Sequence, residues 1–112
     1  MADEDTIDPQ RNLRRMYEYA PLYAQAKADR IHIEGYLKSK KALLMKSCGE
    51  SAIGAQEREA LAHPEYLALL DGLKAAVEQE ELLRYRYETA RVAIDVYRTQ
   101  QASNRNMDRS AA

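Results

Sequence analysis

Four lysines in the segment KSKKALLMK are the first residues of this chain whose type and spacing suggest chemistry: Lys38, Lys40, Lys41 and Lys46. No acidic residue lies between Glu34 and Cys48, so the lysine charges are not offset along this part of the sequence. Such a cluster can contact the phosphates of DNA or RNA. Lysines near the end of a helix also complement its dipole, and this structural interpretation is favoured over a nucleic-acid site.

A second basic group recurs every seven residues in the C-terminal half. Three acids are each followed three positions later by an arginine, and a fourth arginine extends the series: Glu81 and Arg84, Glu88 and Arg91, Asp95 and Arg98, then Arg105. Alone, the arginines would form a stripe that follows a phosphate backbone. Because an acid lies one turn from each of the first three, a salt-bridged, solvent-exposed face is favoured.

Aromatic residues interleave with arginines in the segment RYRYETAR. Tyr85 and Tyr87 lie between or beside basic residues, where their rings could stack on nucleic-acid bases. Both tyrosines also fall on apolar stripes of the expected helix. Core packing is therefore the favoured interpretation for both.

Patterns for catalysis or metal binding are weak. His32 and His63 lie far apart in the sequence, Cys48 is the only cysteine, and no HExxH, CxxC or EF-hand spacing occurs. Gly49 and Gly54 lack the Lys-Ser/Thr pair of a phosphate-binding loop. An enzyme is the least favoured class, and we expect no catalytic residue, no metal and no cofactor.

The longest element that positions these residues is a helix expected over residues 64–101. After Pro64 this segment holds no proline, only one glycine and many strong helix formers. Its apolar residues alternate at spacings of three and four, as in a coiled coil, with Glu80 as the only interruption. This seam consists of Leu69, Leu73, Ala76, Leu83, Tyr87, Ala90, Ile94 and Tyr97.

The N-terminal half is expected to form shorter helices. Asp8 and Pro9 are typical of a helix start. Pro21 predicts a break or kink between helices at 9–19 and 21–48. The segment CGESAIG predicts a loop, after which a short helix at 55–62 leads to the long helix. The acidic residues 1–8 and the tail at 102–112 are expected to be disordered, which leaves one domain at 9–101.

Two long helices joined by one loop predict an all-α fold built on a long antiparallel, coiled-coil-like hairpin with a short N-terminal helix. Equal rise along both helices places Arg30 within about one turn of Glu80. Each residue interrupts the apolar stripe of its own helix. Because a buried charge without a partner is costly, the two are predicted to form a buried ion pair that fixes the register.

A second apolar stripe covers another face of the long helix. Leu82, Tyr85, Thr89, Val92 and Val96 lie well rotated from the seam, so this helix is apolar around more than half of its circumference. One neighbouring helix cannot cover both stripes. We therefore expect self-association into a dimeric four-helix bundle, with Leu82, Tyr85, Val92 and Val96 at the oligomer interface.

Composition and the N-terminal segment indicate the cellular compartment expected for the chain. A single cysteine suits a reducing compartment, and no apolar run approaches the ~20 residues of a membrane span. The N-terminal segment MADEDTIDPQ lacks the features of a secretory signal, and a net charge of -1 argues against a general polyanion binder. These features predict a soluble cytoplasmic protein that does not bind membranes.

Several segments carry a resemblance to a known family: YAQAKA from Tyr23, AHPEY from Ala62, VYR from Val96 and SNR from Ser103. From about Tyr23 to Arg105 the chain resembles a family of small helical proteins of tailed bacteriophages and prophages. Members usually carry Trp where Tyr85 and Tyr97 stand here. The resemblance implies a phage origin and, because such genes often accompany recombination and replication genes, an accessory role in DNA metabolism. It supplies no catalytic residues.

The favoured hypothesis is a non-enzymatic, oligomeric helical protein of phage origin in the cytoplasm of the bacterial host. It would bind itself and another phage or host protein during DNA recombination or replication. A competing hypothesis is direct DNA or RNA binding through the basic first helical arm. A third is a component of the virion or of a scaffold.

Overall fold

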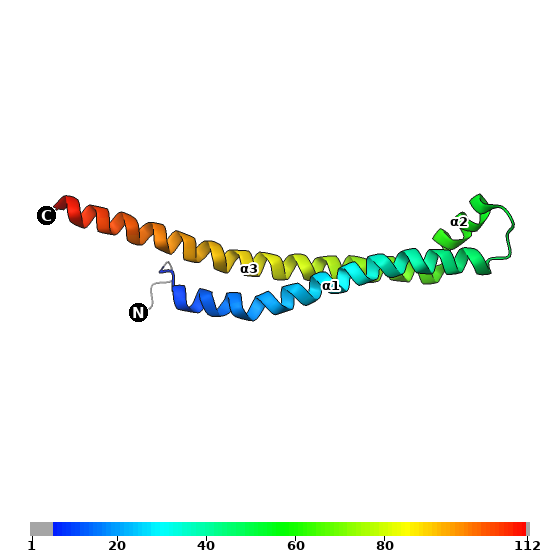
Figure 1. The fold of residues 1–112 in the computed structure, drawn as a ribbon, viewed down its shortest axis with the longest axis horizontal. Helices are drawn as coiled ribbons and strands as arrows, with labels where there is room; N and C mark the ends of the chain where they lie inside the picture. The colour runs from blue at the N-terminus through cyan, green and yellow to red at the C-terminus, as the bar shows by residue number, and fades with distance from the viewer. Residues whose placement is uncertain (1–5, 112) are drawn as a thin grey trace. The chain divides into compact units, whose positions relative to one another are not determined.

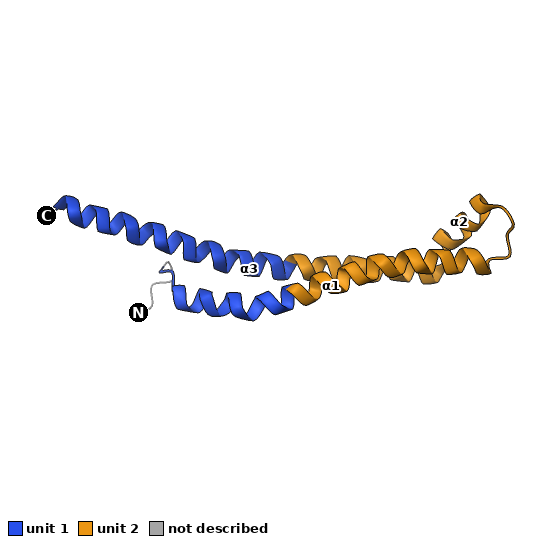
Figure 2. Ribbon diagram, in the orientation of Figure 1, with its two compact units in different colours: residues 1–23, 82–112 blue, residues 24–81 orange. Residues whose placement is uncertain are grey.

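The computed structural model describes residues 6–111 and contains three helices (Figure 1): α1 spans Pro9–Ser47, α2 spans Ile53–Ala62 and α3 spans Pro64–Ala111. No residue between 6 and 111 forms a strand, so the predicted all-α class is confirmed. The described chain packs into two compact units (Figure 2). Unit 1 holds residues up to 23 and from 82 onward, and unit 2 holds residues 24–81.

Asp8 caps the start of α1, as the sequence predicts. Its Oδ1 accepts hydrogen bonds from the backbone N–H groups of Gln10 and Arg11 at 3.0 and 3.2 Å. These are two of the N–H groups that the first turn of a helix leaves without a backbone partner. Residues 6–8 have no regular secondary structure, and the rest of the predicted disordered segment at 1–8 lies outside the described residues.

Pro21 lies inside α1, so the predicted break between helices at 9–19 and 21–48 is wrong. Proline has no N–H, which leaves the carbonyl of Tyr17 without its usual partner four residues later. Tyr17 and Pro21 are both exposed, so water can reach this carbonyl. The half-buried residues Met16, Tyr19 and Tyr23 continue at spacings of three and four across the proline and hold the helix against its neighbour.

Unit 2 contains an antiparallel helical hairpin. Arg30 of α1 contacts Glu80 of α3, and Lys40 contacts Glu65, so moving forward along α1 corresponds to moving backward along α3. The turn between α1 and α2 holds Gly49 with a φ of 81°, a left-handed conformation that glycine adopts without steric strain. α2 begins at Ile53, two residues before the predicted segment at 55–62, and ends at Ala62 as predicted.

The seam predicted for α3 coincides with its least exposed positions. In unit 2, Leu69, Leu73 and Ala76 are half-buried, while Ala26, Leu37 and Leu44 of α1 are buried. In unit 1, Leu83 and Ala90 are buried, and the rings of Tyr87 and Tyr23 lie 6.5 Å apart between their centroids. The alternating spacing of three and four therefore faces α1 within each unit.

α3 continues to Ala111, so the predicted helix end at residue 101 is wrong. Residues 102–111 contain neither proline nor glycine, and the hydroxyl of Ser110 donates to the carbonyl of Asn106 at 3.0 Å. Their side chains are exposed apart from that of Ala102, so local helix propensity rather than packing holds this segment. Residue 112 lies outside the described residues.

Candidate partner-binding surfaces

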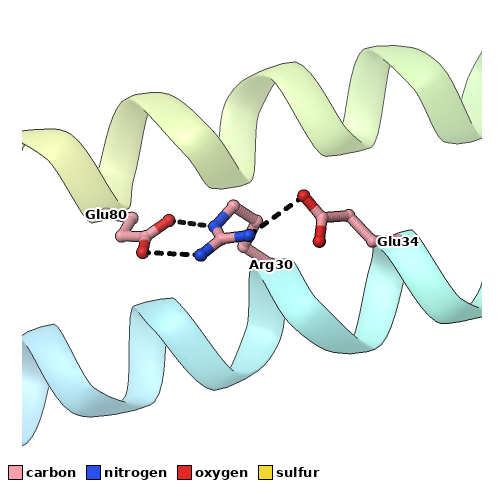
Figure 3. Close-up of polar contacts among 3 residues, drawn as sticks. All are labelled: Arg30, Glu34 and Glu80. Atoms are coloured by element: carbon pink, nitrogen blue, oxygen red, sulfur yellow. Dashed lines mark hydrogen bonds and ion pairs between the residues drawn. The ribbon is translucent and has the colours of Figure 1, made fainter.

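The guanidinium of Arg30 lies between two carboxylates in unit 2 (Figure 3). It donates two hydrogen bonds to Glu80, one of them 3.1 Å between Nη2 and Oε1, and its Nη1 donates to Glu34 Oε1 at 3.0 Å. The bonds to Glu80 and then to Glu34 raise the pKa of Arg30 above its ordinary value. Glu80 is buried but Arg30 is only half-buried, so the pair is less buried than the sequence predicts. The ion pair joins α1 to α3, which indicates a structural role for Arg30 and Glu80.

Two of the four candidate nucleic-acid lysines are already paired within unit 2. Lys40 Nζ lies 2.6 Å from Glu65 Oε2, and Lys41 Nζ lies 2.7 Å from Glu57 Oε1. Hydrogen bonding to the carboxylates raises the pKa of both lysines and lowers the pKa of Glu57 and Glu65. A phosphate would have to compete with these carboxylates for the lysine charges.

Lys38 and Lys46 complete the predicted lysine cluster, and both are exposed. Neither makes an ion pair within residues 6–111. The structure therefore leaves two of the four lysines available to an anionic partner, on the same helix as the two that are paired.

Two ion pairs in the acid and arginine row of α3 join residues four positions apart. Arg84 Nη1 lies 3.2 Å from Glu88 Oε2, and Arg91 Nη1 lies 4.0 Å from Asp95 Oδ2. Each of these arginines reaches the acid four residues later, since residues i and i+4 are neighbours on a helix surface. The guanidinium carbon of Arg84 also lies 4.5 Å from the centre of the Tyr85 ring.

The predicted oligomer-interface residues form an exposed apolar stripe on α3 in unit 1. The exposed fractions are 45% for Leu82, 58% for Tyr85, 48% for Val92 and 41% for Val96. About half of each side chain is left exposed in residues 6–111, although apolar side chains of this size are favourably buried. We call these four residues the apolar stripe.

A groove in unit 1 lies between α1 and α3 and has a volume of about 260 Å³. The guanidinium carbon of Arg86 lies 5.8 Å from the centre of the Tyr19 ring at this groove. Arg15 stands on the α1 side, and Leu82 and Tyr85 of the apolar stripe belong to the α3 side. We call this the arginine groove, and its lining includes Asn12, Arg15, Tyr19, Leu82, Tyr85 and Arg86.

Asn12, Arg15, Tyr19 and Arg86 are not among the site residues predicted from the sequence. The sequence feature that could have indicated this groove is the proximity of arginine and tyrosine in two separate segments, RRMYEY and RYRY. Only the pairing of α1 with α3 brings these segments together. Asn12 is buried, and its side-chain N–H donates to the carbonyl of Asp8 at 2.8 Å, so it closes the floor of the groove without an unsatisfied polar group.

Unit 2 has a groove of its own, with a volume of about 380 Å³. Apolar residues from α1 and α3 form its floor, while Asp29, His32 and Gln79 supply polar atoms. The complete lining is Ala26, Asp29, His32, Ile33, Ala76 and Gln79.

Cys48 and His63 each have a local hydrogen-bond partner. Cys48 is half-buried, and its Sγ donates to the carbonyl of Met45 at 3.2 Å. The backbone N–H of Glu65 donates to His63 Nδ1 at 3.1 Å. Within residues 6–111, no three His, Cys, Asp or Glu side chains converge as a metal site would require.

No helix between residues 6 and 111 combines the length and the apolar character needed to cross a membrane. Comparisons of the chain with protein-family models, with curated proteins and with solved structures found no match.

Proposed function

We propose that this chain is a non-enzymatic helical protein whose function is to bind other polypeptides, including a second copy of itself. The observation that carries the proposal is the apolar stripe of Leu82, Tyr85, Val92 and Val96, which is exposed in unit 1. Burying large apolar side chains is the dominant favourable term in protein association. The simplest assembly is a dimer in which the stripe packs against another helix.

The small core supports the same proposal. The buried hydrophobic residues of the described chain are Ala26, Leu37, Leu44, Ala60, Leu83 and Ala90, and half of these are alanine. Chains of this size bury a smaller share of their surface than larger domains do. Association would add the apolar burial that the chain itself does not provide.

We assign the protein to phage DNA recombination or replication, as an accessory factor in the cytoplasm of the bacterial host. The support is the resemblance of the segments from Tyr23 to Arg105 to phage proteins. The accessory role agrees with the exposed apolar surfaces of the described residues. Its partner would be another phage or host protein.

Sedimentation velocity tests self-association directly. The wild-type chain is expected to sediment as a dimer at micromolar concentration, and Val92→Glu with Val96→Glu is expected to sediment as a folded monomer. Ile53→Glu with Met107→Glu is the matched control, because it places the same charges at exposed apolar residues outside the stripe. A well-folded wild-type monomer at these concentrations would overturn the proposal. Much larger species would instead favour a virion or scaffold component.

The accessory role needs a test in cells. The tagged chain is recovered from phage-infected bacteria after nuclease treatment, beside the Val92→Glu and Val96→Glu variant. Retention of recombination or replication proteins by the wild type supports the assignment, and loss of these proteins from the variant would place their binding on the apolar stripe. Recovery of no such protein by the wild type would contradict the assignment.

A direct nucleic-acid function is the second candidate, because Lys38 and Lys46 are exposed without an ion-pair partner in residues 6–111. Fluorescence polarisation of labelled single- and double-stranded DNA, measured at several salt concentrations, distinguishes it. Affinity that falls steeply with salt, and is lost after Lys38→Glu with Lys46→Glu, would favour this function. Absence of binding at low salt would remove it.

A further inference from the structure

The cations of the two units differ in type. The described part of unit 1 contains nine arginines and no lysine, whereas unit 2 contains six lysines and two arginines. Arginine is enriched and lysine depleted where proteins bind each other, because the planar guanidinium pairs with a carboxylate through two parallel hydrogen bonds. This segregation points to unit 1 as a binding surface for a partner with carboxylates.

Arg15 and Arg86, on the two sides of the arginine groove, have no carboxylate partner within residues 6–111. Some cations elsewhere in residues 6–111 are matched, since Arg91 pairs with Asp95 and Lys40 and Lys41 pair with acids of α3 and α2, whereas Lys38 and Lys46 make no ion pair. Unit 1 also has an excess of cations, with nine arginines against five acids in its described part. The groove therefore presents two unmatched positive charges on opposite rims.

The volume and lining of the groove fit side chains of a helix. Its volume of about 260 Å³ lies below the ~300–1,000 Å³ of pockets that enclose drug-sized ligands. Leu82 and Ala90 give it apolar walls, and its lining comes from both α1 and α3, as in the groove between two helices where a side chain of a third helix packs in a bundle. An apolar residue of such a helix can enter the groove while its flanking residues reach the two rims.

Stacking of nucleic-acid bases is less favoured at this groove. One face of the Tyr85 ring lies under Arg84 at 4.5 Å, and Arg86 lies over the Tyr19 ring at 5.8 Å. A base would have to displace a guanidinium from either ring before it could stack on that face.

We propose that the arginine groove binds an acidic amphipathic helix of a partner protein, with its apolar side against Leu82 and Tyr19. Carboxylates on one flank of that helix pair with Arg15 and those on the other flank pair with Arg86. The proposal deepens the proposed function, since it states the chemistry of the partner that the interaction protein recognises.

The probe is a synthetic helical peptide of about 21 residues with leucine on its apolar side and glutamate on both flanks. A second peptide carries lysine in place of each glutamate, and a single-stranded oligothymidylate of about 20 nucleotides is the third probe. Each is fluorescein-labelled and titrated with the full chain by fluorescence polarisation. We expect the acidic peptide to bind, and the lysine peptide and the oligonucleotide to bind at least about tenfold more weakly.

Arg15→Glu with Arg86→Glu is expected to weaken binding of the acidic peptide at least about tenfold and to strengthen binding of the lysine peptide. Arg98→Glu with Arg105→Glu is the matched control, because it makes the same charge change at exposed arginines of α3 outside the groove. Circular dichroism establishes that both variants retain the wild-type helix content. Equal binding of the acidic peptide by the two variants would overturn the proposal, as would binding of the oligonucleotide alone.

Failure of this proposal is distinguishable from failure of the proposed function. Val92→Glu with Val96→Glu removes self-association but leaves the residues of the arginine groove unchanged, so it should still bind the acidic peptide. Arg15→Glu with Arg86→Glu should still sediment as a dimer. Leu82 and Tyr85 belong to both surfaces, so the monomeric Val92→Glu with Val96→Glu variant is decisive. If this monomer does not bind the acidic peptide while the wild type sediments as a dimer, the groove assignment is rejected and the self-association surface stands.

Discussion

The carboxylate of Glu80 is buried in a seam that is otherwise apolar, and the guanidinium of Arg30 supplies its charged partner. Removing one member of such a pair leaves a charge without compensation, whereas replacing both with apolar residues is often neutral or stabilising. We therefore expect Arg30→Met to lower the free energy of unfolding more than Arg30→Met with Glu80→Leu does.

Urea unfolding followed by circular dichroism measures this difference. Glu34→Gln serves as the control, because Glu34 is exposed and is the second carboxylate bound by Arg30. Glu34→Gln should lower the free energy of unfolding less than Arg30→Met does. Losses that simply add in the double variant would show that Arg30 and Glu80 act independently.

The lysine and glutamate pairs of unit 2 predict how stability changes with pH. The pKa values of Glu57 and Glu65 are lowered from 4.5, so their contribution is complete above that value and is lost as the pH falls through the folded-state pKa. The pKa values of Lys40 and Lys41 are raised from 10.5, so their contribution is lost as the pH rises through the folded-state value. Stability should therefore be highest between about pH 5 and 10.

Urea unfolding from pH 3 to 11 tests this window. Lys40→Gln with Lys41→Gln should reduce the decrease in the free energy of unfolding at both low and high pH. The effect is small because exposed pairs are screened by solvent. Lys38→Gln is the control, since Lys38 makes no ion pair within residues 6–111. An unchanged pH profile in the double variant would contradict a contribution from these pairs.

At the scale of helices, the two adjacent leucines of α1 separate the packed face from the exposed face. Leu44 is buried, whereas Leu43 is 57% exposed. We expect Leu44→Ala to lower the free energy of unfolding by about 2–5 kcal/mol, because it removes buried methyl groups and leaves a cavity. Leu43→Ala should cost about 0.5 kcal/mol or less. Denaturant unfolding compares them, and equal losses would contradict the assignment of the buried face.

Pro21 gives a second prediction for α1. In a continuous helix, Pro21→Ala restores a hydrogen bond to the carbonyl of Tyr17 and removes the clash of the proline ring. Proline also restricts the unfolded chain, which offsets part of the gain. We expect the free energy of unfolding to rise by about 1–2 kcal/mol. A lower stability would instead indicate that the chain bends at Pro21 in a way that alanine does not reproduce.

The sequence predicted the secondary structure best where apolar spacing and capping residues agree. The seam from Leu69 to Tyr97 and the start at Asp8 follow from spacing and from side-chain hydrogen bonding. The break at Pro21 and the end at residue 101 were wrong. An exposed proline leaves the carbonyl of Tyr17 open to water, and the segment after residue 101 has no proline or glycine, so both are compatible with a helix. The arginine groove depends on which faces of α1 and α3 meet, so neither segment alone predicts it.

At the scale of the whole molecule, the exposed apolar stripe predicts that folding and association are interdependent. If a dimer is the most stable species, unfolding must also separate its chains, and the melting temperature then depends on protein concentration. For two chains of 112 residues, we expect a rise of about 3–5 °C for each tenfold increase in concentration.

Thermal unfolding by circular dichroism between 1 and 100 µM measures this dependence. Val92→Glu with Val96→Glu should melt at one temperature over the whole range, because the free monomer has no association equilibrium to shift. Ile53→Glu with Met107→Glu should retain the wild-type slope, since both residues lie outside the apolar stripe. A wild-type melting temperature that does not change with concentration would mean that the native protein is a monomer with the apolar stripe exposed to solvent. Its four residues would then have to be explained by a partner that is not a copy of this chain.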